Sequence, residues 1–332
     1  MTEITGDGTG NIHLPARTIP IPHSISPAAR QFLTLPHTPI EWPCGSDPAV
    51  WKAFLAQCDA TLAVRFSFMK PFPGSVESEA LGGAPTFKLT PGGVPTANQG
   101  HAILYVHGGG FVMGGGELAA KAAQVYALKC GMVVYAVDYR LAPDHPYPAA
   151  LDDVVAAYRG LLDRYVPEKT AIIGISAGGG LVASALLKVR DAGMPLPAAA
   201  VLLTPECDLT ESGDSFETLR DLDVILHRRP TAPTLLYAAG HDLRDPMLSP
   251  LFGDFTRGFP PTLLISGTRD LFLSNTVRLH RALRRAGAHA DLHVFEAMPH
   301  GGFYGAPEDA DSLAEQIRFL HCCWSMRASP PI

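Results

Sequence analysis

The sequence has few charged residues and no apolar run long enough to cross a membrane. Charged residues make up 17% of the chain, and the formal net charge of −6 comes without a long basic run. This balance argues against nucleic acid as a partner. Glycine or charge interrupts every apolar stretch before the ~18 residues needed to span a bilayer. The first residues, Met1 to Asp7, lack the basic and apolar regions of a signal peptide, and we predict a cytoplasmic protein.

Metal and phosphate motifs are also missing. The six cysteines form no CxxC pair, and no group of histidines, cysteines and carboxylates has metal-ligand spacing, so we expect neither a metal nor another cofactor. The run Gly114-Gly115-Gly116 lacks the lysine and hydroxyl of a phosphate-binding loop. Most cysteines lie in apolar stretches, which is typical of small, reduced core residues.

Hydrophobic residues, at 47% of 332, are numerous enough for a large buried core. From about residue 102, short apolar runs alternate with segments of helical periodicity. The expected strands are 103–106, 132–137, 171–175, 199–203, 262–265 and 291–295. The expected helices are 118–130, 149–164, 178–191, 275–286 and 312–324. Such alternation predicts the α/β class, with a mostly parallel sheet covered by helices on both faces.

Apart from a hairpin expected at residues 76–89, two segments do not follow this alternation. Residues up to about Pro43 are rich in proline, threonine and serine, and Asp47-Pro48 predicts the start of a helix. Residues 76–89 resemble a hairpin that turns at Gly82-Gly83. The stretch from Asp208 to about Arg244 belongs to no strand–helix unit.

The predicted domain organisation follows from these two segments. We expect an N-terminal arm with cap helices at residues 1–72 and a second cap segment at 208–244. The catalytic domain would occupy residues 73–207 and 245–332. We expect the two cap segments to form a lid over the active edge of the sheet.

The pentapeptide Gly174-Ile175-Ser176-Ala177-Gly178 stands directly after a predicted strand and directly before a predicted helix. This is the context of a nucleophile elbow, in which a strained turn exposes the serine and only glycines allow neighbouring chain to pass so close. The pentapeptide alone is weak evidence, because a glycine-rich chain contains it by chance fairly often. Its place between strand and helix makes Ser176 the predicted nucleophile.

A second glycine motif, His107-Gly108-Gly109-Gly110, follows the strand at 103–106. Its backbone N–H groups can approach an oxyanion without interference from a Cβ atom. We predict an oxyanion hole made by Gly108, Gly109 and Ala177. A turn alone rarely needs three successive glycines. We expect His107 to be structural, holding the loop through its imidazole.

In combination, these motifs resemble those of the hormone-sensitive lipase family of α/β-hydrolases, the bacterial family IV esterases. The resemblance covers about residues 76–324. Its further motifs are Asp138-Tyr139-Arg140-Leu141-Ala142-Pro143, 147–153, 260–265, Gly267-Thr268-Arg269-Asp270 and Met298-Pro299-His300-Gly301. It implies the α/β-hydrolase fold with a helical cap, and ester hydrolysis without a cofactor.

The resemblance and the chain order serine, acid, histidine assign Asp270 as the residue that orients His300. Asp242 and Asp245 are the rival acids, but they lie in the irregular stretch rather than at the end of a strand. His300, in a glycine-rich loop after the last strand, is the histidine placed to reach Ser176.

Three positions depart from the family pattern. Ile175 stands where an acidic residue is usual, which removes one local hydrogen bond. Ser274 replaces a second aspartate after the catalytic one, and we expect a looser loop around Asp270. Gly302 is an extra glycine before Phe303, so the turn after the histidine is expected to differ.

Two acids, Glu206 and Asp208, follow the strand at 199–203 and lie near the active edge. We favour a structural role for both, capping the next segment and supporting the site, over a direct part in the chemistry.

The predicted activity is that of a serine carboxylesterase acting on uncharged esters of short to medium acyl chain. We expect an apolar cleft lined by Phe111, Val112, Met113, Phe216, Leu219, Phe272 and Phe303. Lactones, amides or acetylated sugars are alternative substrates for the same triad. A ligand receptor of the same fold is a further alternative, against which the presence of His300 speaks. The family also suggests a homodimer through the edge strand at 291–295.

Overall fold

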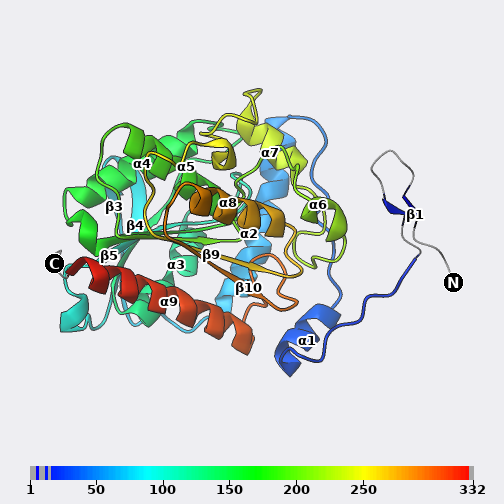
Figure 1. Cartoon of the computed structure of the whole chain (residues 1–332), viewed down its shortest axis with the longest axis horizontal. Coiled ribbons are helices and arrows are strands. Elements are labelled where there is room, and N and C mark those ends of the chain that lie inside the picture. The colour runs from blue at the N-terminus through cyan, green and yellow to red at the C-terminus, as the bar shows by residue number, and fades with distance from the viewer. Residues whose placement is uncertain (1–4, 7–11, 14–15, 329–332) are drawn as a thin grey trace.

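A computed structural model describes residues 5–6, 12–13 and 16–328, and it is built around one eight-stranded sheet (Figure 1). The strand order is β10-β9-β8-β7-β5-β6-β4-β3. The strands are β3 (Gly74–Leu81), β4 (Ala84–Pro91), β5 (Ala102–Val106), β6 (Val133–Val137), β7 (Thr170–Ile175), β8 (Ala199–Leu203), β9 (Thr262–Gly267) and β10 (Ala290–Phe295). The six strands from β5 to β10 pair in parallel, and β3 and β4 extend the sheet antiparallel. The predicted α/β class and mostly parallel sheet are confirmed.

The parallel strands are apolar on both faces because both faces are covered. In β5, Leu104 and Val106 point into one hydrophobic cluster, whereas Ile103 and Tyr105 point into the other. All five residues of this strand are buried. Continuous burial explains why these strands appear in the sequence as unbroken apolar runs rather than as alternating patterns.

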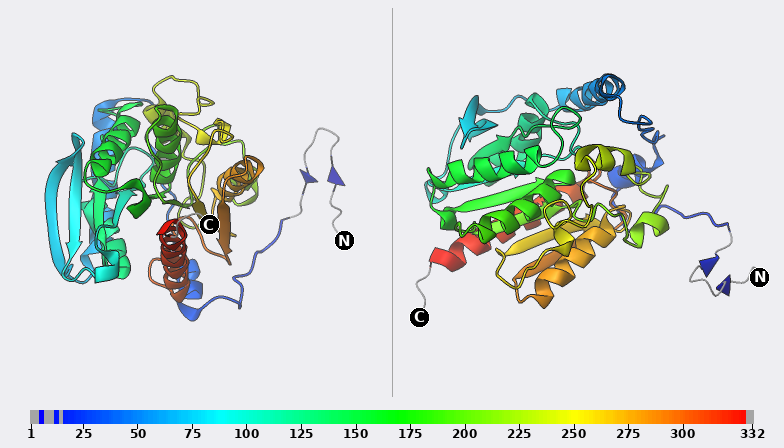
Figure 2. Two further views of the ribbon diagram at one scale, coloured as in Figure 1. Left: turned by 60° about the vertical axis from the view of Figure 1, so that its left-hand side comes forward. Right: turned by 90° about the horizontal axis from the view of Figure 1, so that it is seen from above.

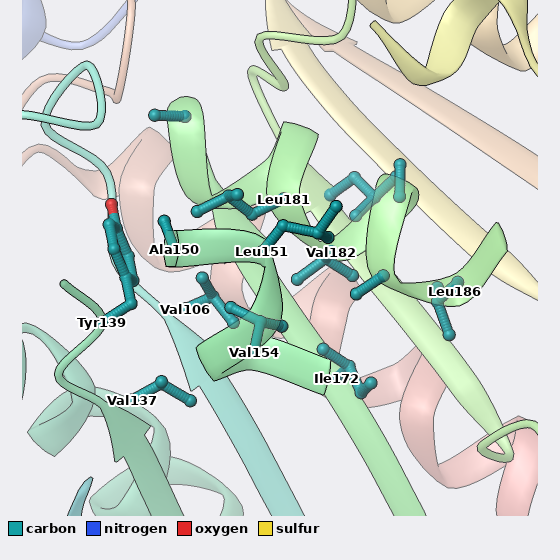
Figure 3. Close-up of a cluster of buried hydrophobic side chains, with 14 of the residues drawn as sticks. Val106, Val137, Tyr139, Ala150, Leu151, Val154, Ile172, Leu181, Val182 and Leu186 are labelled. Atoms are coloured by element: carbon teal, nitrogen blue, oxygen red, sulfur yellow. The ribbon is translucent and has the colours of Figure 1, made fainter. Parts of the chain in front are cut away.

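Five long helices cover the two faces (Figure 2). They are α3 (Glu117–Cys130), α4 (Ala149–Leu162), α5 (Ala177–Asp191), α8 (Leu273–Arg285) and α9 (Pro307–Ala328). Side chains of α4, α5 and α8 pack into one cluster with the sheet, and those of α3 and α9 pack into the other. Figure 3 shows the first cluster, in which Leu151 and Val154 of α4 and Leu181 of α5 meet Val106 and Ile172 of the strands.

The remaining helices belong to the segments that the sequence set apart. They are α1 (Pro27–Thr34), α2 (Pro48–Ser67), α6 (Ser215–Thr218) and α7 (Thr231–Ala238). Asp47 caps α2 as predicted, its side chain accepting a hydrogen bond from the N–H of Ala49. Ser26 caps α1 and also binds Glu308 at the start of α9 through its N–H and its hydroxyl. In Figure 1, α1, α6 and α7 lie at the same end of the sheet.

Two short strands, β1 (Thr5–Gly6) and β2 (Ile12–His13), pair antiparallel before the first helix. Residues 1–4, 7–11 and 14–15 of the predicted N-terminal arm (1–72), and the last four residues of the predicted catalytic domain, lie outside the described part of the chain. The hairpin predicted for 76–89 is confirmed as β3 and β4, which turn at Gly82 and Gly83, both with positive φ. Over the described ranges, we find no helix with the length and apolarity needed to cross a membrane.

Candidate active site

Ser176 occupies the sharp turn between β7 and α5, with a φ of 56° and a ψ of −125°. A residue other than glycine rarely adopts a positive φ, so the surrounding chain must hold the backbone of Ser176 in this conformation. Two glycines make the turn sterically feasible. A Cβ atom on Gly174 would lie 2.4 Å from the carbonyl oxygen of Gly178, and one on Gly178 would lie 2.3 Å from that of His107. The structure therefore has the strand–turn–helix geometry that the motif predicts.

Ser176, His300 and Asp270 lie in a hydrogen-bonded row. His300 Nε2 is 2.9 Å from Ser176 Oγ, and His300 Nδ1 is 3.0 Å from Asp270 Oδ1. Asp270 is fully buried, and its carboxylate also accepts hydrogen bonds from the hydroxyl of Ser266 and the N–H of Phe272. The row places a hydroxyl, an imidazole and a carboxylate within hydrogen-bonding reach of one another, as a nucleophile, a base and an orienting acid would need to be.

The rival acids and histidines lie elsewhere. Asp242 accepts a hydrogen bond from the N–H of Arg244, and Asp245 from the N–H of Met247 and the hydroxyl of Tyr147. Neither aspartate contacts His300. His289 and His293 lie at the edge strand β10, where His289 faces Asp291 at 3.5 Å.

The electrostatic setting of His300 combines burial with negative charge. Burial lowers the pKa of its imidazole, but the hydrogen bond to Asp270 and the charges of Asp270, Asp223 and Glu206 raise it, and the net direction is upward. Negative charge nearby favours the imidazolium that forms when a base takes a proton. The site is therefore arranged to accept a proton from Ser176.

The loop after β5 lies directly against Ser176. A Cβ atom on Gly108 would lie 3.1 Å from the Cβ of Ser176, and Gly109 has a φ of 120°. Among the described residues, the N–H groups of Gly108, Gly109 and Ala177 donate to no protein acceptor. Three donors beside one serine match the arrangement expected of an oxyanion hole.

His107 holds this loop from behind. Its ring stacks on Tyr139 at 4.1 Å, and Nδ1 donates to the carbonyl oxygen of Gly108 at 2.7 Å. Burial lowers the pKa of His107 to about 4, so the ring is neutral at physiological pH. Among the described residues, the buried Nε2 has no hydrogen-bond partner. His107 thus contacts the loop and Tyr139, and its structural role stays a prediction.

A cavity of about 260 Å³ opens onto Ser176 and His300. On its sheet side it is bounded by Gly108, Gly109, Ser176, Glu206 and His300. Its cap side, as we call it below, is made by apolar residues of the arm, of α2 and of the 208–244 segment. These are Ile40, Trp42, Leu62, Phe66, Ile225, Leu226 and Pro230. The two irregular segments thus meet over the same cavity.

The predicted lining residues divide into two groups. Met113 and Phe272 line the cavity, whereas Phe111, Val112, Phe216, Leu219 and Phe303 do not. All seven residues were predicted to line the cavity because they are apolar, but these five pack into hydrophobic clusters behind the cavity wall. Phe111 stacks on Tyr237 at 4.1 Å, Val112 joins the main core, Phe216 and Leu219 pack with Leu271, and Phe303 packs with α1. The prediction is therefore wrong for these five residues. The sequence alone does not show which apolar residues line the cavity and which pack in the hydrophobic core.

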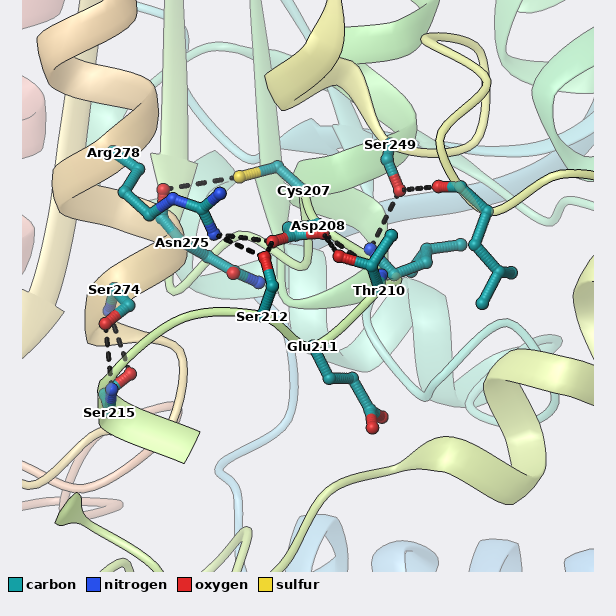
Figure 4. Close-up of polar contacts among 12 residues, drawn as sticks. Cys207, Asp208, Thr210, Glu211, Ser212, Ser215, Ser249, Ser274, Asn275 and Arg278 are labelled. Atoms are coloured by element: carbon teal, nitrogen blue, oxygen red, sulfur yellow. Dashed lines mark hydrogen bonds and ion pairs between the residues drawn. The ribbon is translucent and has the colours of Figure 1, made fainter. Parts of the chain in front are cut away.

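Glu206 and Asp208 differ sharply in their surroundings. Asp208 is buried but accepts hydrogen bonds from Thr210, Ser212 and Arg278, and these bonds lower its pKa despite its burial (Figure 4). Glu206 lines the cavity, and its carboxylate accepts a hydrogen bond from the hydroxyl of Thr234 at 3.2 Å. Burial, together with the charge of Glu211, raises the pKa of Glu206 to about 8. Asp208 fits the structural role predicted for it, whereas Glu206 faces the reaction cavity.

The three departures from the family pattern have local explanations. Ser274 and Ser215 of α6 exchange hydrogen bonds between side chain and backbone N–H, so Ser274 fastens the Asp270 loop to the cap (Figure 4). The turn at Gly302 closes on Asp309, whose carboxylate accepts from the N–H groups of Phe303, Gly305 and Ala306. Ile175 lines the cavity with an apolar side chain.

Asp223 is a site residue that the sequence did not reveal. It lies in the irregular segment, is fully buried, and accepts hydrogen bonds from the N–H groups of Leu271 and His300. Together with Asp270 and His300 it forms a group of potential metal ligands among the described residues. The nitrogens of His300 are already bonded to Asp270 and Ser176, and Asp223 is occupied by backbone donors. In the sequence, Asp223 stands in an apolar part of the irregular stretch, and no motif there indicates this role.

Comparison with known proteins agrees with this geometry. A family model described as an alpha/beta hydrolase fold matches residues 103–304. An acetyl-hydrolase of Streptomyces hygroscopicus is 36% identical over 62% of this chain and 69% of its own length. A carboxylesterase of Mycobacterium tuberculosis, NlhH, is 31% identical over 60% of this chain and 65% of its own.

Solved structures extend the similarity to nearly the whole chain. The crystal structure of an esterase superposes with a TM-score of 0.86 and 36% identity, covering 93% of this chain and 97% of that one. A hormone-sensitive lipase from a metagenome library superposes with a TM-score of 0.76 and 32% identity, covering 81% and 91%.

Proposed function

Because the chain belongs to the hormone-sensitive lipase family of α/β-hydrolases and is a carboxylic-ester hydrolase, we propose that Ser176, His300 and Asp270 form its catalytic triad. The observation that carries the proposal is the row of hydrogen bonds of 2.9 and 3.0 Å that joins the three side chains. Ser176 would attack the ester carbonyl while His300 Nε2 takes its proton, and Asp270 would stabilise the resulting imidazolium.

The oxyanion of the tetrahedral intermediate would be held by the N–H groups of Gly108, Gly109 and Ala177. Their lack of protein acceptors in the described structure supports this role. His300 would then protonate the leaving alcohol, and an ester bond between Ser176 and the acyl group would remain. A water molecule, deprotonated by His300, would release the acid and restore the serine.

The substrates we propose are uncharged esters with short to medium acyl chains. The cavity lining in the described part of the chain includes no lysine or arginine that could anchor a carboxylate or phosphate. The cap side of the cavity is apolar throughout. The cavity volume of about 260 Å³ suits a small ester rather than a long lipid.

Two further proposals concern the setting of the enzyme. We place it in the cytoplasm, which is supported by the six free cysteines. We also propose a homodimer through β10, because this parallel strand lies at the open edge of the sheet.

Replacement of Ser176 by alanine tests the triad most directly. We expect kcat on p-nitrophenyl esters to fall on the order of 10⁴- to 10⁶-fold, with the fold unchanged by circular dichroism. A fluorophosphonate should label Ser176 in the wild type, as mapped by peptide mass spectrometry. Ser184→Ala, in the helix α5 that follows the Ser176 turn but outside the cavity, is the matched control and should keep full activity. Labelling of another residue, or an active Ser176→Ala variant, would show that the nucleophile lies elsewhere.

A further inference from the structure

Asp223 joins three segments that are far apart in the sequence. Its Oδ2 accepts a hydrogen bond from the N–H of Leu271, the residue after Asp270, at 2.8 Å. The N–H of His300 lies 3.2 and 3.3 Å from its two oxygens. Its Oδ1 also accepts from the N–H groups of Ile225 and Leu226, at 2.9 and 3.1 Å. One carboxylate therefore contacts the acid loop, the histidine loop and the cap.

The partners of Asp223 are all functional positions of the proposed site. Leu271 N–H fixes the turn that presents Asp270, and His300 N–H fixes the backbone of the proposed base. Ile225 and Leu226 line the cap side of the cavity. The neighbouring Val224 packs on the cluster that contains Met298 and Phe303, which flank His300. Movement of Asp223 would therefore change the triad and the cavity wall together.

The charge of Asp223 also reaches the imidazole. Its carboxylate lies within 4.8 Å of the ligand atoms of Asp270 and His300. Burial raises the pKa of Asp223 to about 6 and that of Glu206 to about 8. Because the pKa of His300 is raised above its ordinary value, Asp223 is ionised where His300 titrates, whereas Glu206 is still protonated there. The charges that favour the protonated imidazole in this range are therefore those of Asp270 and Asp223. Only Asp270 bonds to the ring, so Asp223 acts on it through space and through the backbone N–H.

The structure leads us to propose, on the basis of the triad proposed above, that Asp223 is a positioning residue with two effects. It keeps the acid loop, the histidine loop and the cap side of the cavity in one arrangement, and it places a second negative charge beside the imidazolium of His300. Four backbone donors hold the carboxylate as an acceptor, and its full burial leaves no room for water to take its place.

Asp223→Asn tests the proposal, because the amide has the same size but carries no charge and replaces one acceptor oxygen with a donor. We expect kcat to fall about 10- to 100-fold through misplacement of the triad. The acidic limb of the pH profile of kcat/KM should shift to lower pH, since one of the two carboxylate charges that favour the imidazolium is gone. KM should rise more for a p-nitrophenyl octanoate than for the acetate, because Ile225 and Leu226 lose their anchor.

The controls separate this role from a general effect on folding. Asp208→Asn changes another buried acid at the start of the same cap segment, one that bonds to Arg278 rather than to the triad, and its pH profile should match the wild type. All rates are expressed per active site titrated with fluorophosphonate, so that unfolded protein is not counted. Asp223→Ser, neutral but still an acceptor, repeats the measurement should the asparagine variant yield few titrated sites.

The outcomes are distinct. A lower kcat with a shifted acidic limb in either Asp223 variant supports the proposal. Wild-type rates, or a lower melting temperature with an unshifted limb, overturn it and leave Asp223 as a structural residue. If the wild type itself is not labelled at Ser176, the proposed triad fails instead, independently of the result at Asp223.

Discussion

The two sides of the cavity are built in different ways. On the sheet side, the groups that face the reaction centre are backbone N–H groups and three polar side chains fixed by strand ends. Gly174 and Gly178 allow β7, α5 and the loop after β5 to approach within van der Waals contact. On the cap side, the wall consists of apolar side chains from the arm, from α2 and from the 208–244 segment.

The cap is attached to the rest by a small number of polar contacts. Asp223 reaches Leu271 and His300, the Ser215–Ser274 pair joins α6 to α8, and Thr234 of α7 bonds to Glu206. Strand pairing and close backbone packing thus hold the geometry of the proposed triad. The cap is held mainly by single side chains, together with a hydrogen bond from the N–H of Tyr147 to the carbonyl oxygen of Tyr237 in α7. The difference indicates that lining residues of the cap side away from Asp223, such as Leu62 and Phe66, can change, and with them the substrate preference, without disturbing the reaction centre.

The largest expected contrast between the two sides is in catalysis. Asp270→Asn keeps the size of the buried acid but leaves no carboxylate to stabilise the imidazolium, and we expect kcat to fall about 10⁴-fold. Asp245→Asn, which alters an acid directly after the 208–244 segment that is bonded to Met247 and Tyr147, should change kcat less than about threefold. Steady-state kinetics on p-nitrophenyl butyrate measure both. A severe loss in the Asp245 variant would mean that the acid has been misassigned.

The second contrast concerns backbone packing on the sheet side. In Gly178→Ala, the new Cβ atom would lie 2.3 Å from the carbonyl oxygens of both Val106 and His107. Neither backbone can retreat without breaking the elbow, so we expect a loss of more than about 3 kcal/mol in the free energy of unfolding. Gly93→Ala, where no atom lies within 4 Å and φ is not positive, is the matched control and should change stability by less than about 0.5 kcal/mol. Urea denaturation compares the two, and equal stabilities would show that the elbow is not tightly packed.

The same difference explains which features could be predicted from the sequence. Strands covered on both faces must be apolar along their whole length, and glycines at a close approach cannot be replaced. Both constraints leave local patterns, so the sheet and the elbow with Ser176 could be predicted from them. Asp270 and His300 were assigned instead through the family resemblance and the chain order. The structure places these three side chains in contact, and their roles stay a proposal for the experiments above.

The contacts between the cap and the loops at the edge of the sheet left no such pattern in the sequence. Whether Phe111 or Phe303 lines the cavity or packs behind it depends on which helix covers it, and that is decided by tertiary contacts over long sequence separations. Asp223 illustrates the same limit, because its partners lie 48 and 77 residues away. The reciprocal bonds of Ser274 depend likewise on where α6 docks. A single sequence contains no local pattern from which these contacts could be predicted.

The smallest expected effect lies where the two sides meet, at Glu206. Burial raises its pKa to about 8, whereas the unfolded chain would release the same proton near pH ~4.3. The folded state therefore binds one more proton than the unfolded state between these values, and this group makes stability fall as pH rises through that window. Above about pH 8 both states are ionised and the loss stays constant.

Glu206→Gln removes this titration while keeping the size of the side chain and its contact with Thr234. Relative to the wild type, we expect the variant to gain about 2 kcal/mol in the free energy of unfolding between pH 5 and pH 7. Thr234→Val, which deletes the hydroxyl partner but leaves the acid, should retain the wild-type trend with pH. Urea denaturation at pH 5, 6, 7 and 8 measures the differences. A constant difference between the glutamine variant and the wild type at all four pH values would mean that Glu206 is already ionised at pH 5, with the cavity solvated well enough to hold its charge.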